Sequence, residues 1–203
     1  MKLDGRFLVD AAMREMNVTR LNRQIFLGID LGQREYHSAF VVLERFEVMP
    51  SYTDVLRGKD IYCRYVVRQA ERVGLGTPYA EVVGRVKRIV DALGDGCIVV
   101  VDETGVGVPV VESMRRVVRG CAILPITITT GARSTGSSVP RAELVTRLQM
   151  MVQAGELEIA HGCRHGEELQ RELVHLQLQG KHGEEPDDLA MALALACWKA
   201  WVR

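Results

Sequence analysis

Carboxylates stand at three places where secondary-structure elements are expected to end or begin. Two apolar stretches, Phe26–Asp30 and Ile98–Asp102, each end on an aspartate, and the pair Asp187 and Asp188 precedes a final apolar helix. Apolar runs of this length are typical of strands that are buried on both faces, so each aspartate should lie at the edge of a covered sheet. Carboxylates that meet there repel one another unless a cation neutralises them. The pattern therefore predicts a metal site.

A trio of carboxylates suits the hydrolysis of a phosphodiester by two metal ions. One ion generates and directs hydroxide while the other stabilises the leaving oxygen, with the ions roughly 3.5 to 4 Å apart. Hard oxygen ligands favour Mg²⁺ or Mn²⁺. Each acid alone has a structural interpretation, since Asp30 and Asp102 could begin turns and Asp187 or Asp188 could cap a helix. Their order of strand, strand and helix favours the metal site, with these four residues as catalytic ligands.

The remaining pattern predicts the elements that position these acids. Strands are expected at residues 25–30, 36–46, 61–69, 97–102, 121–129 and 157–160. Helices are expected at residues 5–20, 78–93, 109–119, 140–154, 167–178 and 187–202. The β-β-β-α-β-α-β order, followed by helices, predicts an α/β fold with a mixed sheet flanked by helices on both faces. Acids at the ends of the first and fourth strands and at the start of a closing helix resemble the ribonuclease H-like arrangement.

Length and composition indicate a single large domain. With 203 residues, the chain is expected to form a nuclease-like domain over residues 25–203, preceded by a helical extension over residues 1–24. No apolar run is long enough to span a bilayer, and the N-terminus lacks the apolar core of a secretory signal, so a cytoplasmic protein without membrane contact is expected. The five scattered cysteines favour reduced core thiols over a disulfide framework.

Four segments around the acids carry a family resemblance: residues 28–32, 101–111, 139–159 and 172–196. In this order and spacing they resemble the nuclease domain of phage terminase large subunits, the DNA-packaging motor proteins. The resemblance covers about residues 25–200. It places the family's metal ligands on Asp30, Asp102 and the Asp187/Asp188 pair, and it implies two Mg²⁺ or Mn²⁺ ions and double-stranded DNA as substrate. If the chain comes from a phage or prophage, the host cytoplasm is its expected location.

The chain departs from that family at several points. Pro186 stands where the family often has His, and Arg141 where it often has Lys. No Gly-x-x-x-x-Gly-Lys-Ser/Thr phosphate loop occurs, so the chain cannot translocate DNA by itself. An ATPase domain, a portal protein or a small terminase subunit is therefore an expected partner. Glu103 follows Asp102 directly and would point the opposite way in a regular strand, which makes it a candidate outer-shell group.

Basic side chains near these acids are candidates for phosphate contacts, although the formal net charge is zero. Arg64, Arg68, Arg133 and Arg141 are the expected DNA-binding residues, while surface arginines are more often simply solvated. Residues 130–139 are rich in Gly, Ser and Thr and predict a mobile loop that could close on DNA. Further basic candidates are Arg57, Lys59, Arg72 and Arg147.

Three other functions stay open at this point. A Holliday-junction resolvase-like nuclease would use the same fold on branched DNA. Residues 28–32 also look like the first phosphate motif of actin-like ATPases, although one chain of this length supplies only one of the two lobes. A non-catalytic DNA-binding or packaging module could keep the fold without the chemistry. A dinucleotide fingerprint at Gly105 is not favoured because position 110 is Val, nor is a zinc site at residues 161–165, which lacks a second Cys/His pair.

Overall fold

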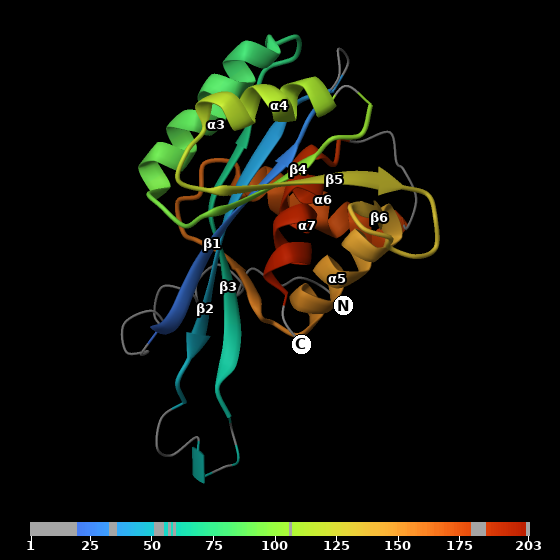
Figure 1. Ribbon diagram of the computed structural model, residues 1–203. Coiled ribbons are helices and arrows are strands. Elements are labelled where there is room, and N and C mark those ends of the chain that lie inside the picture. The colour runs from blue at the N-terminus through green and yellow to red at the C-terminus, as the bar shows by residue number, and fades with distance from the viewer. Residues whose placement is uncertain are drawn as a thin grey trace.

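The computed structural model describes residues 20–32, 36–50, 55–56, 58, 60–105, 107–179 and 186–201. The helix expected over residues 5–20 lies outside them, apart from Arg20. The first half of the described chain contains β1 (Arg20–Asp30), β2 (Ala39–Val48), β3 (Tyr62–Arg72), α3 (Tyr79–Leu93), β4 (Ile98–Asp102) and α4 (Gly107–Val117) (Figure 1). The second half contains β5 (Ala122–Thr129), β6 (Ser138–Pro140), α5 (Arg141–Gln153), β7 (Leu157–Ile159), α6 (Gly166–Gln179) and α7 (Asp188–Ala200).

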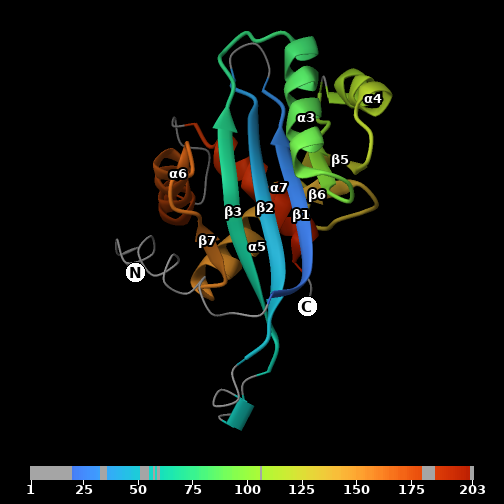
Figure 2. The ribbon, with the colours of Figure 1, turned by 90° about the vertical axis from the view of Figure 1, so that its left-hand side faces the viewer.

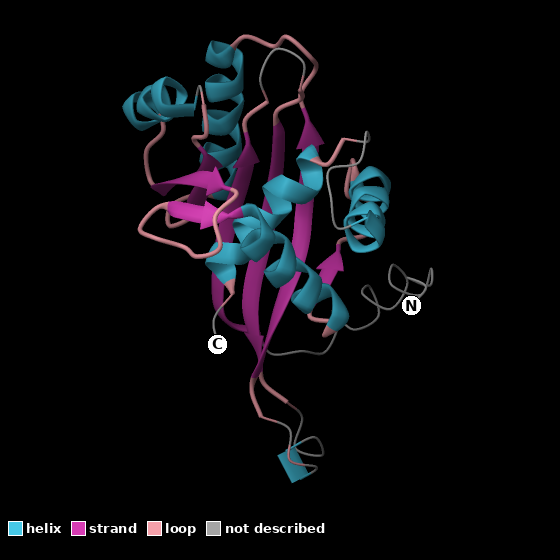
Figure 3. Ribbon diagram, turned by 90° about the vertical axis from the view of Figure 1, so that its right-hand side faces the viewer, coloured by secondary structure: helices cyan, strands magenta, loops and turns pink. Residues whose placement is uncertain are grey.

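The seven strands form one mixed sheet in the order β6-β5-β4-β1-β2-β3-β7. β1, β2 and β3 are an antiparallel meander, whereas β4 pairs parallel to β1 and β5 pairs parallel to β4. Helices α3 and α4 cover one face of the sheet (Figure 2), and α5, α6 and α7 lie on the other (Figure 3). The predicted α/β architecture and its β-β-β-α-β-α-β order are therefore confirmed.

Both central strands are buried on their two faces, as their apolar runs predict. In β1, Phe26 packs into the core beneath α7, whereas its neighbour Leu27 packs into the core beneath α3 and α4. In β4, Val100 packs into the core beneath α7, and Val101 packs into the core beneath α3 and α4. Because successive residues of a strand point to opposite faces, continuous apolar runs are needed where helices cover both sides.

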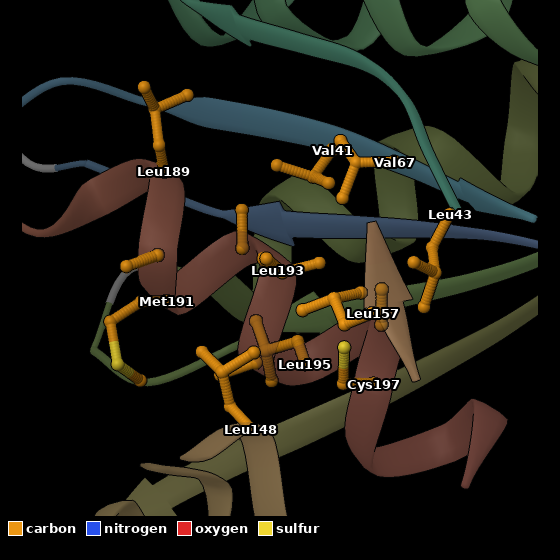
Figure 4. Close-up of a cluster of buried hydrophobic side chains, with 14 of the residues drawn as sticks. Val41, Leu43, Val67, Leu148, Leu157, Leu189, Met191, Leu193, Leu195 and Cys197 are labelled. Carbon is orange, nitrogen blue, oxygen red and sulfur yellow. The ribbon is translucent and has the colours of Figure 1, made fainter. Parts of the chain in front are cut away.

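Helix α7 forms the centre of the larger core. Every residue from Leu189 to Cys197 is buried, and Figure 4 shows its leucines packed against Val41 and Val67 of the sheet and Leu148 of α5. The helix also approaches β1 closely at Gly28, where a Cβ atom would come within 1.9 Å of the Ala192 carbonyl oxygen. Glycine in the strand and alanine in the helix thus allow the two backbones to meet, which brings the start of α7 to the end of β1.

Two expectations about the elements need correction. Residues 138–140, expected as the last two residues of a loop and the first residue of a helix, form strand β6 and pair parallel with Thr127–Thr129 of β5. This strand has only three residues and ends on a proline, so periodicity could not reveal it. β1 begins at Arg20, earlier than the expected residue 25. Within the described residues, no helix is both long and apolar enough to cross a membrane.

A buried glutamate ties the three meander strands together and gives a prediction about pH. Glu44 of β2 accepts hydrogen bonds from the Nε atoms of Arg23 and Arg68, each at 2.5 Å, and the residue is 3% exposed. Burial alone would raise the pKa of Glu44, but the hydrogen bonds from Arg68 and Arg23 outweigh it and hold the pKa below its ordinary value of 4.5. A carboxyl whose pKa is lowered by folding stabilises the fold above its unfolded-state pKa.

We therefore expect Glu44→Gln to lower the free energy of unfolding at pH 7 by about 2 kcal/mol, since charge-assisted hydrogen bonds are lost. In the wild type this contribution should disappear as the pH falls below about 4.5 and through the lowered pKa, so the two proteins should converge in acid. Urea unfolding at pH 7 and at stepwise lower pH measures both effects. Glu112→Gln, which removes an exposed carboxylate from α4, is the matched control. A constant difference between wild type and E44Q at every pH would contradict the prediction.

Candidate metal centre

Two of the predicted acids end neighbouring strands at one edge of the sheet. Asp30 is the last residue of β1 and Asp102 the last residue of β4, and these parallel strands pair Ile29 with Val101. The two aspartates are therefore the next residues in register, and adjacent strands lie about 4.8 Å apart. The pairing of β1 with β4 thus brings together acids that are 72 positions apart in the sequence.

The other two predicted acids reach the same region from the start of α7. Burial raises the pKa of Asp30 well above its ordinary value, and the negative charges of Asp102, Asp188 and Asp187 raise it further, while Arg141 opposes them. The carboxylates of Asp102, Asp187 and Asp188 therefore each lie close enough to Asp30 to act on it electrostatically. Ionising Asp30 among them is unfavourable unless positive charge enters the site.

Asp102 is held in place by the turn that follows its strand. Its Oδ1 atom accepts hydrogen bonds from the Thr104 backbone N–H at 2.8 Å and from the Thr104 hydroxyl at 2.5 Å. The same hydroxyl oxygen accepts the backbone N–H of Ile128 in β5 at 2.9 Å. Burial raises the pKa of Asp102, and the bonds from Thr104 partly offset this rise. One oxygen of the carboxylate is thereby oriented by two donors.

Glu103, the candidate outer-shell group, accepts a hydrogen bond from the Thr127 hydroxyl at 3.3 Å. Its negative charge also contributes to the raised pKa of Asp102. Glu103 therefore acts on the site electrostatically, through the neighbouring carboxylate.

Arginine side chains lie against the two acids of α7. Arg141, the first residue of α5, forms an ion pair with Asp187. Arg72, the last residue of β3, places its Nε atom 3.4 Å from Oδ2 of Asp188. Burial raises the pKa of Asp188, and the positive charge of Arg72 opposes the rise, with a smaller contribution from His37. The guanidinium groups thus supply part of the positive charge that the acids require.

One residue of this network was not predicted. Glu172 of α6 is buried, forms an ion pair with Arg72, and accepts the Ala190 backbone N–H of α7 at 2.9 Å. Burial raises the pKa of Glu172 to about 7, with Asp188 and Asp187 adding to the rise while the Ala190 N–H and Arg72 oppose it. A signal did exist in the sequence, because Glu172 interrupts the apolar stripe that Leu169 and Leu173 form on α6.

The predicted acids offer the oxygen ligands that a hard divalent cation prefers, although their side chains are not arranged around a metal position. Among the described residues, no three His, Cys, Asp or Glu side chains form a group that could hold a metal ion as they stand. The acids around Asp30 nevertheless offer only carboxylate oxygens, the ligands that Mg²⁺ and Mn²⁺ prefer. Burial, and then the negative charges of the neighbouring acids, raise the pKa of Asp30, and a bound cation would favour its ionised form.

The predicted DNA-binding arginines occupy different places. Arg141 lies in the site, and Arg133 is exposed in the loop that precedes β6. Arg68 is paired with Glu44, and Arg64 with Glu158 of β7. Eight residues of extended strand put Arg64 roughly 25 Å from Arg72 at the site edge. Contact of these arginines with DNA stays a prediction, and Arg141 is the one that forms an ion pair with a predicted acid.

A mixed sheet of this order, with aspartates at the ends of β1 and β4 and a closing helix against β1, defines a ribonuclease H-like α/β fold. Among solved structures, the chain is similar to the crystal structure of the large terminase nuclease from the thermophilic phage G20c, with a TM-score of 0.54. The two share 21% sequence identity, and the match covers 86% of this chain and 81% of that one. At this level of identity the likeness shows the fold. No protein-family model matches the sequence, and neither does any curated protein.

Proposed function

We propose that this protein is a divalent-metal-dependent endonuclease that hydrolyses phosphodiester bonds of double-stranded DNA, as the packaging nuclease of phage terminases does. The observation that carries the proposal is the placement of Asp30 and Asp102 at the ends of neighbouring parallel strands, with Asp187 and Asp188 at the start of α7 close enough to raise the pKa of Asp30. The fold shared with a phage terminase nuclease supports the same conclusion. A packaging role would make an ATPase domain, a portal protein or a small terminase subunit its partner.

The residues of the proposed site would have different roles, which follow from their positions. Asp30 and Asp102 would bind Mg²⁺ or Mn²⁺ jointly, and Asp187 or Asp188 would complete the site. Two such ions, when bound, supply a reactive hydroxide and stabilise the leaving oxygen. Thr104 keeps Asp102 oriented by donating two hydrogen bonds to one of its oxygens. Arg141, which forms an ion pair with Asp187, would be able to donate to a DNA phosphate if that carboxylate bound a cation.

Metal dependence and substrate are tested together. We expect purified protein to nick and linearise supercoiled plasmid in Mn²⁺ or Mg²⁺ and to stop when EDTA is added, with agarose electrophoresis as the measurement. Calorimetric titration with Mn²⁺ alone should show binding that disappears in Asp30→Asn. Linear and four-way-junction DNA of equal length, compared in one assay, separate a packaging-type nuclease from a junction resolvase. Absence of Mn²⁺ binding, together with absence of cleavage, would overturn the proposal and leave a non-catalytic module.

A further inference from the structure

The first turn of α7 is capped from an unusual direction. Asp187 occupies the N-cap position, where an aspartate normally accepts a backbone N–H of the first turn, yet its side chain makes no such hydrogen bond. Its carboxylate is paired with Arg141 instead. The Ala190 N–H, one of the donors that a helix start leaves without an intrahelical partner, is satisfied by Glu172 of α6. A neighbouring helix therefore supplies the cap.

The capping glutamate is itself held by the sheet edge that carries the acids. Ala39 of β2 pairs with Asp30 on one side and with Arg72 on the other, so these three residues form one row across the sheet. Residues directly opposite one another in antiparallel strands point to the same face, here the face that α7 covers. Arg72 extends over this face to form its ion pair with Glu172, and its Nε lies beside Asp188. The row thereby connects β1, β3, α6 and α7.

We propose that Glu172 is a positioning residue for the metal centre: by capping α7 in place of Asp187, it leaves the Asp187 carboxylate directed to Arg141 and the site rather than to its own helix. The inference rests on the proposed function. Without Glu172, the Asp187 carboxylate would turn to the unsatisfied N–H groups of its own helix, as an N-cap aspartate usually does. Arg72 would then keep only Asp188 as a partner and would neutralise an oxygen that a cation needs. Each change removes a carboxylate oxygen that could otherwise coordinate a metal ion in the site.

The test compares Glu172→Ala with Glu172→Gln, because the glutamine oxygen can still accept the Ala190 N–H and alanine cannot. Amide hydrogen exchange of the full chain without metal should be faster at Ala190 by on the order of fivefold in E172A and nearly unchanged in E172Q. Titration with Mn²⁺ alone should show affinity weakened by about 10- to 100-fold in E172A and largely restored in E172Q.

Glu71→Ala is the matched control. Glu71 of β3 forms a partly buried ion pair with Arg85 of α3 at 2.5 Å, directed to the opposite face of the sheet. If E71A loses as much thermal stability as E172A but keeps Mn²⁺ affinity and Ala190 exchange, the effect of Glu172 is specific to the site.

Three results would overturn the inference. Unchanged exchange at Ala190 in E172A would show that Glu172 is not the cap. Unchanged Mn²⁺ affinity in E172A, with wild-type binding intact, would show that capping does not serve the site. Lost Mn²⁺ binding in both E172A and E172Q, with normal exchange in E172Q, would make Glu172 a direct ligand. Failure of the proposed function would give a different result from failure of this inference. Wild-type protein would then bind no Mn²⁺, while hydrogen exchange at Ala190 would still show whether Glu172 caps α7.

Discussion

Asp30→Asn is expected to abolish DNA cleavage, with a loss in kcat of about a thousandfold or more. Asparagine has nearly the shape of aspartate but carries no negative charge, so the site would lose the acid on which the other three act electrostatically. A plasmid-cleavage time course in Mn²⁺ measures the effect. Asp91→Asn, which removes an exposed carboxylate from α3, should cut at the wild-type rate.

Asp30→Asn is expected to raise the stability of the fold, although it abolishes cleavage. Burial and the neighbouring acids raise the pKa of Asp30, so its ionised form is disfavoured in the folded state. The wild type should therefore lose stability as the pH rises from the unfolded-state pKa, near 3.8, through the raised folded-state pKa. D30N carries no such charge and should be the more stable protein at pH 8 in EDTA, with the difference shrinking in acid. Thermal unfolding at several pH values provides the measurement.

These two readouts separate a metal ligand from a residue needed only for folding. A D30N protein that cuts DNA at the wild-type rate would refute the assignment of Asp30. A D30N protein that is inactive and also unfolded at neutral pH would contradict the electrostatic account of the site, since removal of a repelled charge should not destabilise the fold.

Gly28→Ala should cause the largest loss of stability among single-methyl changes in the central sheet, about 3 kcal/mol. The added Cβ would lie 1.9 Å from the Ala192 carbonyl oxygen and 3.0 Å from the Ala196 backbone nitrogen, so α7 must move away from β1. Both contacts are with backbone, which cannot yield as a flexible side chain does. Since α7 carries Asp187 and Asp188, the shift should also weaken Mn²⁺ binding.

Urea unfolding measures the loss, and Gly84→Ala is its control. Gly84 lies inside α3, and a Cβ there would have only the end of the Arg88 side chain nearby, at 3.7 Å. Alanine is a better helix former than glycine, so G84A should be more stable than the wild type by up to about 1 kcal/mol. A G28A protein as stable as the wild type would show that the close approach of α7 and β1 is not needed.

The fold could be predicted because its strongest signals are local. The apolar runs that end at Asp30 and Asp102 identify strands covered on both faces, and the helix signals around Pro78 and Gly94 agree with α3. β6 was missed because its three residues gain their structure from pairing with Thr127–Thr129, which no local pattern encodes. The start of β1 was placed too late because Asn22, Arg23 and Gln24 are polar and exposed, and the strand is extended there by its pairing with β2.

The site was only partly predictable for a related reason. Aspartates at strand ends can be found from sequence, since the strand pattern itself gives their position. The cap that Glu172 provides for α7 depends on how α6 packs against α7, and the ion pair with Arg72 depends on where β3 ends. Similarly, no local pattern in the sequence indicated that carboxylates of β7 and β2 pair with Arg64 and Arg68. Such contacts arise from tertiary packing.

The central place of α7 has a consequence for biosynthesis. Ribosomes deliver β1 to α6 before this helix, so a nascent chain exposes the apolar sheet face that α7 later buries. Such exposed surface is prone to aggregation and to chaperone capture. The last two acids arrive on the same helix, which means that translation must pass residue 188 before all four carboxylates exist on one molecule. Chains interrupted before that point would carry an incomplete acidic cluster and could not form the proposed metal centre.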